Sequence, residues 1–197
     1  MKTIKIQKDQ ILYSQGDEVS SVFVVKKGKI RLYILAEDGR DVSLDIVGEN
    51  EVFGVLGKIS DEFAQAFEDS ELIGIQQSEF DTLSKKTLLW ILREISKRNE
   101  ICKMRMKQIL LMPLEQRLFH TADYLASKVG RRENGRVTID LSQEEFASFC
   151  GASRECVSKV LSKMKDIGIV KTNRRKIVLY ITKMDRFYDY SNLKEVK

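Results

Sequence analysis

The sequence predicts an α+β protein with an N-terminal β-sandwich or barrel, one long helix and a C-terminal winged helix-turn-helix. Three observations predict this order. Residues 1–80 contain many short apolar stretches separated by turn signals, and residues 85–111 contain neither glycine nor proline. Residues 142–168 hold two short helical patterns joined by a glycine. The 197 residues are enough for two domains with separate cores.

The N-terminal region favours strands because apolar residues recur in short runs bounded by glycine, asparagine and aspartate. Many short strands at this spacing are typical of a sandwich or barrel. A short helix is expected to begin at Ser78, with Asp81 completing an approximate capping box. The predicted strands are residues 3–6, 10–13, 22–25, 30–35, 42–46, 64–67 and 72–75.

Residues 85–111 form one predicted helix with a heptad pattern along one side. Such a pattern either pairs with the same helix of a second copy or is buried within one chain. A polar residue at one position of the pattern is typical of coiled coils that fix their register and oligomeric state, so Asn99 favours a homodimer. The pattern, which we call the heptad seam, consists of Leu88, Leu92, Ile95, Asn99, Cys102, Met106 and Ile109.

The only proline, Pro113, suits the start of a second helix and marks a hinge. That helix is expected to run to about Val129 and to stop at Gly130. A loop at residues 131–135 and a strand at residues 136–141 are expected next. The predicted domains are residues 1–84, 85–111 and 112–197.

The segment from Ser142 predicts a helix-turn-helix. Ser142 and Glu145 form a capping box, Gly151 supplies a left-handed turn residue, and Ser153 caps the second helix. The expected inner face of the second helix is Val157, Val160, Leu161 and Met164. A hairpin with a basic tip, Arg174, Arg175 and Lys176, follows as a predicted wing, and its last strand is expected at residues 177–181.

Charge is unevenly distributed: residues 1–111 hold 17 Lys/Arg against 18 Asp/Glu, whereas residues 112–197 hold 17 against 11. The basic half is either a solvated surface or the binding face for an anionic partner, of which double-stranded DNA is the commonest. Arg154, Glu155 and Lys159 are expected to read base edges, because their donors and acceptors match guanine and cytosine. The expected contacts to the DNA backbone are Ser142, Ser153, Ser158, Arg174, Arg175 and Lys176.

The stretch from Gly151 to Leu161, Gly-Ala-Ser-Arg-Glu-Cys-Val-Ser-Lys-Val-Leu, resembles the recognition helix G-x-S-R-E-T-V-x-R-x-L of the cyclic-AMP receptor protein / fumarate-nitrate regulator (CRP/FNR) family of bacterial transcription regulators. The resemblance extends in order over nearly the whole chain. It implies that the N-terminal region is a double-stranded β-helix (jelly roll) like that of cyclic-nucleotide-binding domains. It also implies a homodimer, contact with RNA polymerase, and an inverted repeat of TGTGA-like half-sites. Lys159 replaces the family's arginine, which weakens the expected outer guanine contact.

Family members that bind cyclic nucleotides carry a phosphate cassette, and this sequence departs from it. Val55 replaces the glutamate that binds the ribose. In a shortened loop at residues 58–63, Glu62 replaces the arginine and Phe63 replaces the serine that bind the phosphate. A carboxylate repels a phosphate, so cyclic-AMP binding is not expected. The effector is either absent or unknown, such as an organic acid or a redox signal. The rival function is a sensor whose output is a protein contact, with a vestigial DNA-binding module.

The sequence gives little indication of catalysis, of cofactor or metal binding, or of redox sensing. No nucleophile–base pair or phosphate-binding glycine loop appears, so no enzyme is expected, and neither a cofactor nor a metal site is predicted. His120 has no partner histidine, so we expect an ordinary helical histidine and not a haem or zinc ligand. Cys102 is either a packed thiol or a redox sensor, and oxidation of Cys156 would disturb DNA binding. Three cysteines without CxxC spacing, no signal core and no membrane span predict a cytoplasmic protein.

Overall fold

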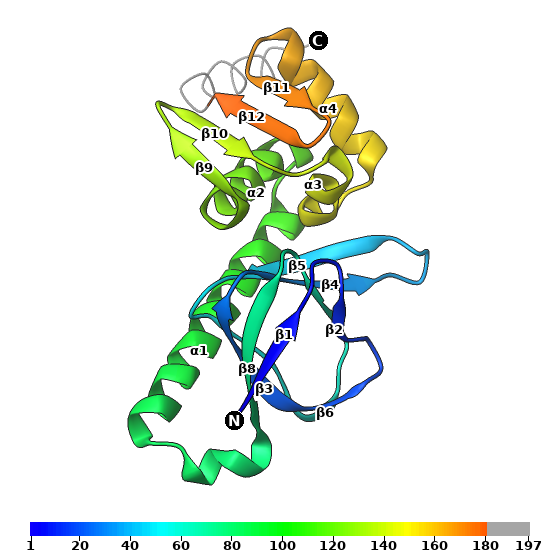
Figure 1. The fold of residues 1–197 in the computed structure, drawn as a ribbon. Coiled ribbons are helices and arrows are strands. Elements are labelled where there is room, and N and C mark those ends of the chain that lie inside the picture. The colour runs from blue at the N-terminus through cyan, green and yellow to red at the C-terminus, as the bar shows by residue number, and fades with distance from the viewer. Residues whose placement is uncertain (181–197) are drawn as a thin grey trace. The chain divides into compact units, whose positions relative to one another are not determined.

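A computed structural model of the chain describes residues 1–180 (Figure 1). Its contacts divide the chain into two compact units, with the division between Met106 and Lys107 inside the long helix. The predicted α+β class is confirmed. The first unit is the predicted jelly roll, which we call the β-roll, and the second unit is a winged helix-turn-helix.

The first unit contains two four-stranded antiparallel sheets. The strands are β1 (Lys2–Ile6), β2 (Ile11–Tyr13), β3 (Glu18–Lys27), β4 (Ile30–Leu35), β5 (Asp41–Val47), β6 (Val52–Ile59), β7 (Phe63–Ala66) and β8 (Ser70–Gln76). Their orders are β1-β8-β3-β6 and β2-β7-β4-β5. An aromatic cluster occupies the core: the rings of Phe23 and Phe53 stack at 5.3 Å, and Tyr13 lies 6.0 Å from Phe23.

Strand β6 was missed by the sequence prediction, and the predicted loop at residues 58–63 was wrong. Strand β6 runs to Ile59, so only residues 60–62 separate it from β7. Gly54 makes this strand hard to recognise, because glycine weakens a strand pattern. Its φ is 115°, and an added Cβ would lie 2.5 Å from the carbonyl oxygen of Ser21 on β3. The glycine is therefore required by the close approach of β3.

The short helix after β8 differs from the prediction in its type and its cap. It is a 3₁₀ helix, η1 (Gln77–Thr82), and Gln76 and Glu79 form its capping box in place of Ser78 and Asp81. The carboxylate of Glu79 accepts a hydrogen bond from the backbone N–H of Gln76 at 3.0 Å. A glutamine cap is a weak sequence signal, because glutamine is not among the residues preferred at that position.

The long helix, α1 (Lys85–Leu111), has the predicted bounds. Near its start, Ile91 is only 3% exposed and packs in a second cluster with Val22, Val52 and Ile75. These three residues come from β3, β6 and β8, so the first part of α1 covers the sheet that these strands form. The outer face of this sheet is thus buried by the helix.

The second unit packs three helices against one face of a four-stranded sheet of order β11-β12-β10-β9 (Figure 1). Its elements are α2 (Leu114–Val129), β9 (Gly130–Glu133), β10 (Arg136–Ile139), α3 (Gln143–Cys150), α4 (Arg154–Asp166), β11 (Val170–Asn173) and β12 (Lys176–Tyr180). Pro113 and Gly130 flank α2, as predicted. No helix within residues 1–180 combines the length and apolarity that crossing a membrane needs.

The predicted loop at residues 131–135 was wrong, because most of it is strand β9. Arg132 pairs with Val137 and Glu133 with Arg136 in an antiparallel ladder, so only Asn134 and Gly135 form the turn. Both turn residues have positive φ, 49° and 70°, as a tight hairpin turn requires. The predicted last strand also included Ile181, which lies outside the described residues.

Candidate nucleic-acid interface

Helices α3 and α4 are joined by a turn whose caps fix its geometry. The hydroxyl of Ser142 accepts a hydrogen bond from the Glu145 N–H at 3.2 Å, and the Glu145 carboxylate accepts one from the Ser142 N–H at 2.7 Å. Gly151 ends α3 with φ 59°, and Ser153 accepts a hydrogen bond from the Cys156 N–H at 3.3 Å. The predicted capping residues are therefore confirmed, and they hold the two helices in a rigid helix-turn-helix.

One face of α4 is buried and the opposite face is open to solvent. The predicted inner residues, Val157, Val160, Leu161 and Met164, are all buried. The predicted base-reading residues Arg154, Glu155 and Lys159 are all exposed, as is Ser158. They lie in the first two turns of α4, so one stretch of helix presents both cations and a carboxylate.

The start of α4 favours an ionised Glu155. A hydrogen bond from its own backbone N–H, followed by one with the Ser153 side chain, lowers the pKa of the Glu155 carboxyl. The nearby charges of Arg154 and Lys159 lower this pKa further. An ionised carboxylate only accepts hydrogen bonds, which suits it to the amino group of cytosine.

The wing is the hairpin of β11 and β12. Asn173 pairs with Lys176, which leaves Arg174 and Arg175 as the turn. Both arginines are exposed, and the Arg174 N–H donates to the side-chain oxygen of Asn173 at 2.8 Å. The basic tip predicted from the sequence is thus a tight turn with its cations in solvent.

Two side-chain contacts connect the wing to α3, and the sequence prediction did not include them. Arg175 forms an ion pair with Glu145 at 2.9 Å, and Gln143 donates to the Thr172 hydroxyl at 3.3 Å. Burial raises the pKa of Glu145, but its hydrogen bonds with Ser142 and the Arg175 charge outweigh this, so the pKa is lowered. Glu145 therefore caps α3 and holds the wing arginine at the same time.

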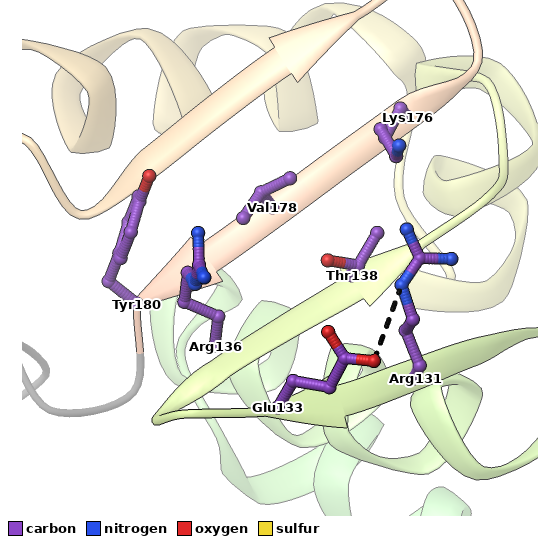
Figure 2. Close-up of a pocket in the computed structure, with 7 residues that line it drawn as sticks. All are labelled: Arg131, Glu133, Arg136, Thr138, Lys176, Val178 and Tyr180. Carbon is purple, nitrogen blue, oxygen red and sulfur yellow. Dashed lines mark ion pairs between the residues drawn. The ribbon is translucent and has the colours of Figure 1, made fainter.

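The sheet face that the helices do not cover carries a shallow polar hollow of about 230 Å³ (Figure 2). The lining residues are Arg131, Glu133, Arg136, Thr138, Lys176, Val178 and Tyr180. Arg131 lies 4.0 Å from Glu133 and 3.8 Å from Asp140. Lys176, which was predicted to contact the DNA backbone, belongs to this face and extends the basic surface of the wing.

The heptad seam of α1 is largely exposed. Leu92 is 62% exposed and Met106 is 57% exposed, whereas Leu88 is partly buried. Asn99 and Cys102 are exposed as well. A single chain therefore leaves an apolar stripe along the helix uncovered, and such a stripe is typical of an interaction surface.

The region that departs from the phosphate cassette contains a buried carboxylate. Glu62, which is 8% exposed, accepts a hydrogen bond from the Tyr13 hydroxyl at 3.0 Å and lies 3.4 Å from Arg98 of α1. No sequence signal had indicated Arg98, because a charged residue on a helix usually faces water. Only the spacing of Ile91, Arg98 and Arg105, one heptad apart, could have suggested a second contact face on α1.

The remaining candidates for chemistry are dispersed. His120 and Cys156 are exposed and Cys150 is buried. Partial burial of the Cys102 thiol raises its pKa, which reduces the fraction of reactive thiolate at neutral pH. Within residues 1–180, no three histidine, cysteine, aspartate or glutamate side chains are grouped closely enough to hold a metal ion.

Family models match each unit of the chain. The model of the cyclic nucleotide-binding domain matches residues 3–87, and that of the Crp-like helix-turn-helix domain matches residues 116–190. The chain is 23% identical over 191 residues to the anaerobic regulatory protein of Bacillus subtilis, covering 89% of this chain and 79% of the relative. It is 24% identical over 191 residues to a CRP-like cAMP-activated global transcriptional regulator of Mycobacterium tuberculosis, covering 91% of this chain and 84% of the relative.

Solved structures show the same fold. A transcriptional regulator of the CRP/FNR family from Thermus thermophilus superposes with a TM-score of 0.81 at 20% identity, over 94% of this chain and 97% of that chain. A c-di-GMP responsive global regulator from Xanthomonas campestris superposes with a TM-score of 0.82 at 19% identity, over 91% of this chain and 93% of that chain.

Proposed function

Because the chain belongs to the CRP/FNR family of bacterial transcription regulators, we propose that it is a cytoplasmic homodimer that binds an inverted repeat of TGTGA-like half-sites. The observation that carries this proposal is the exposed start of α4. Arg154, Glu155 and Lys159 share the solvent face of a helix that is fixed by the Ser153 cap. A helix presented in this way fits the major groove of DNA.

Each of the three side chains has a distinct role in the proposed reading of the half-site. Arg154 donates two hydrogen bonds to one guanine, and Glu155 accepts one from a cytosine amino group. Lys159 reaches the outer guanine with a single ammonium group, so this contact discriminates less well than an arginine would. The pattern of donors and acceptors thus selects G·C pairs at defined positions.

The phosphate backbone is held by residues around this helix. Ser142, Ser153 and Ser158 lie at or near the starts of α3 and α4, where helix N-termini attract anions. The basic wing, Arg174, Arg175 and Lys176, adds affinity that does not depend on sequence. Contact with RNA polymerase is expected from the family and is a further part of the proposal.

The exposed heptad seam supports the homodimer. Two copies that pair through this stripe bury its leucine, isoleucine and methionine side chains, with Asn99 fixing the register. A two-fold dimer presents two α4 helices, which matches an inverted repeat with half-sites about one helical turn apart.

Cyclic AMP is not required in this proposal. Val55 and Phe63 lack the polar groups that hold a ribose and a phosphate, and the Glu62 carboxylate repels a phosphate. Glu62 is also already engaged with Tyr13 and Arg98. The regulator is therefore expected to bind DNA without a nucleotide.

The test is fluorescence anisotropy of purified, reduced protein with a labelled TGTGA inverted repeat and with a scrambled duplex at the same salt concentration. The repeat is expected to bind about a thousandfold more tightly than the scrambled duplex, with or without added cyclic AMP. Equal weak binding to both duplexes would contradict the proposed half-site. Tighter binding only after addition of cyclic AMP would contradict nucleotide independence.

Removal of the wing cations tests the proposed backbone contact. Replacing Arg174 and Arg175 together by alanine is expected to weaken binding to every duplex and to reduce the slope of log affinity against log salt by about 1 to 2. The slope is measured by anisotropy over a salt series. The matched control replaces Lys2 and Lys5, two exposed lysines of β1 in the first unit, and should leave the slope unchanged. An unchanged slope in the wing variant would remove the wing from the interface.

A further inference from the structure

The side of α1 that faces the β-roll carries two arginines one heptad apart, Arg98 and Arg105. Arg105 is only 8% exposed, and its guanidinium donates to the backbone carbonyl oxygens of Leu44 and Ser43 on β5. Arg98 reaches two carboxylates instead. Arginine is suited to both tasks because its planar fork has five N–H donors.

The guanidinium of Arg98 lies between two segments that are far apart in the sequence. Its Nη2 is 3.4 Å from Oε2 of Glu62, in the short loop between β6 and β7. Its Nε is 3.5 Å from Oδ2 of Asp45 on β5. The side chains of Asp45, Glu62 and Arg98 are only 4%, 10% and 21% exposed, so water screens these ion pairs weakly.

Neighbouring groups hold Glu62 in place for this contact. The Tyr13 hydroxyl donates to its other carboxylate oxygen, and the Ser60 hydroxyl donates to its backbone carbonyl oxygen at 2.8 Å. Burial raises the pKa of Glu62, while the Arg98 charge and the Tyr13 hydrogen bond oppose the rise. Burial and the Glu62 charge raise the pKa of Tyr13, so its hydroxyl stays protonated and remains a donor.

Two nearly buried carboxylates without a cation would be strongly unfavourable, because each has lost most of its hydration. The cation that lies against both comes from α1, the helix that also carries the heptad seam. Docking of α1 therefore compensates the charge inside the β-roll. A helix that left this position would take this cation away from both carboxylates.

We propose that Arg98 is a positioning residue: its ion pairs with Glu62 and Asp45 dock α1 on the β-roll without any ligand. The docking itself concerns the first unit alone. Without a ligand, the docked helix keeps the heptad seam and the orientation of α1 fixed. This consequence for DNA binding rests on the proposed function. The same geometry makes a second prediction, namely that removal of the guanidinium leaves a site for a guanidinium ion.

The experiment compares the full-length wild type with Arg98→Ala, Arg98→Lys and the matched control Arg93→Ala, which removes an exposed arginine of the same helix. Hydrogen exchange of α1 amides, relative to those of β3 and β8, reports docking, and anisotropy reports DNA affinity. Arg98→Ala is expected to speed exchange in α1 by at least about tenfold and to weaken DNA binding by a similar factor, with the strands unaffected.

Rescue separates positioning from general stability. Millimolar guanidinium chloride should restore slow exchange and DNA affinity to Arg98→Ala, whereas sodium chloride at the same ionic strength should not. Arg98→Lys should fall between wild type and alanine, because an ammonium reaches the two carboxylates less well. Two results would overturn the proposal. One is that the α1 amides of Arg98→Ala exchange at the wild-type rate. The other is that Arg93→Ala speeds exchange in α1 and weakens DNA binding as much as Arg98→Ala does.

Two further outcomes are decisive. If Arg98→Ala does not fold, Glu62→Gln combined with Asp45→Asn removes the demand for a cation, and Arg98→Ala in that background should then fold. Failure of the triple variant to fold would overturn the proposal. If exchange responds as expected but even the wild type does not prefer the TGTGA repeat, the docking role stands and the proposed half-site fails.

Discussion

Replacing Leu92 by glutamate is expected to convert the dimer into monomers and to weaken binding to the inverted repeat by about a hundredfold or more. Leu92 is 62% exposed on the heptad seam, so a single chain does not need its apolar surface. In a two-fold pair, two glutamates at this position would face each other in a buried interface. A monomer binds one half-site only and loses the gain from linked binding, which is typically 10²- to 10⁴-fold.

The measurements are analytical ultracentrifugation and anisotropy with the same duplex. The matched control is Met104→Glu, because Met104 is an exposed apolar residue of α1 that lies outside the heptad seam. That control receives the same charge change and should remain dimeric. A dimeric Leu92→Glu protein, or a monomeric Met104→Glu protein, would show that α1 pairs through a different face.

Arg154→Ala is expected to remove discrimination at one base pair of each half-site while weak non-specific binding persists. A bidentate arginine contact to guanine contributes about 1–3 kcal/mol of discrimination, which corresponds to about 5- to 150-fold for each half-site. Arg154 is exposed at the first position of α4, directly after the Ser153 cap. The side chain can therefore reach a base without rearrangement of the helix.

The measurement is anisotropy with a set of duplexes that differ at single positions of the half-site. Lys163→Ala serves as the control, because Lys163 is an exposed cation in the last turn of the same helix. It should lower affinity slightly for all duplexes and leave the preference intact. Equal loss on all duplexes with Arg154→Ala would assign this arginine to a phosphate instead of a base.

The helix-turn-helix could be predicted from sequence almost residue by residue because its signals are local. Ser142, Glu145 and Ser153 cap helices through bonds to residues three positions away, and Gly151 adopts the left-handed conformation that favours glycine. The buried face of α4 follows from helical periodicity alone. These interactions need no knowledge of the rest of the fold.

Strands β6 and β9 could not be predicted in the same way. Strand β6 contains Gly54 and Gly57, and β9 contains three charged residues, so both patterns favour loops. Each is a strand because a neighbour supplies the hydrogen-bonding partners: β3 for β6, and β10 for β9. A ladder between strands depends on tertiary pairing, which propensity does not encode.

The sequence by itself determined the fold class, the long helix and its heptad seam, and the caps that place Arg154 on α4, because each depends on periodicity or on contacts a few residues apart. The tertiary structure decided the partners of Arg98, Arg105 and Arg175. Asp45 and Glu62 reach Arg98 across 53 and 36 positions of the chain, and Glu145 reaches Arg175 across 30. Which charges meet, and which are buried when they meet, is fixed only when strands and helices pack, since the energy of an ion pair depends on distance and on exclusion of water.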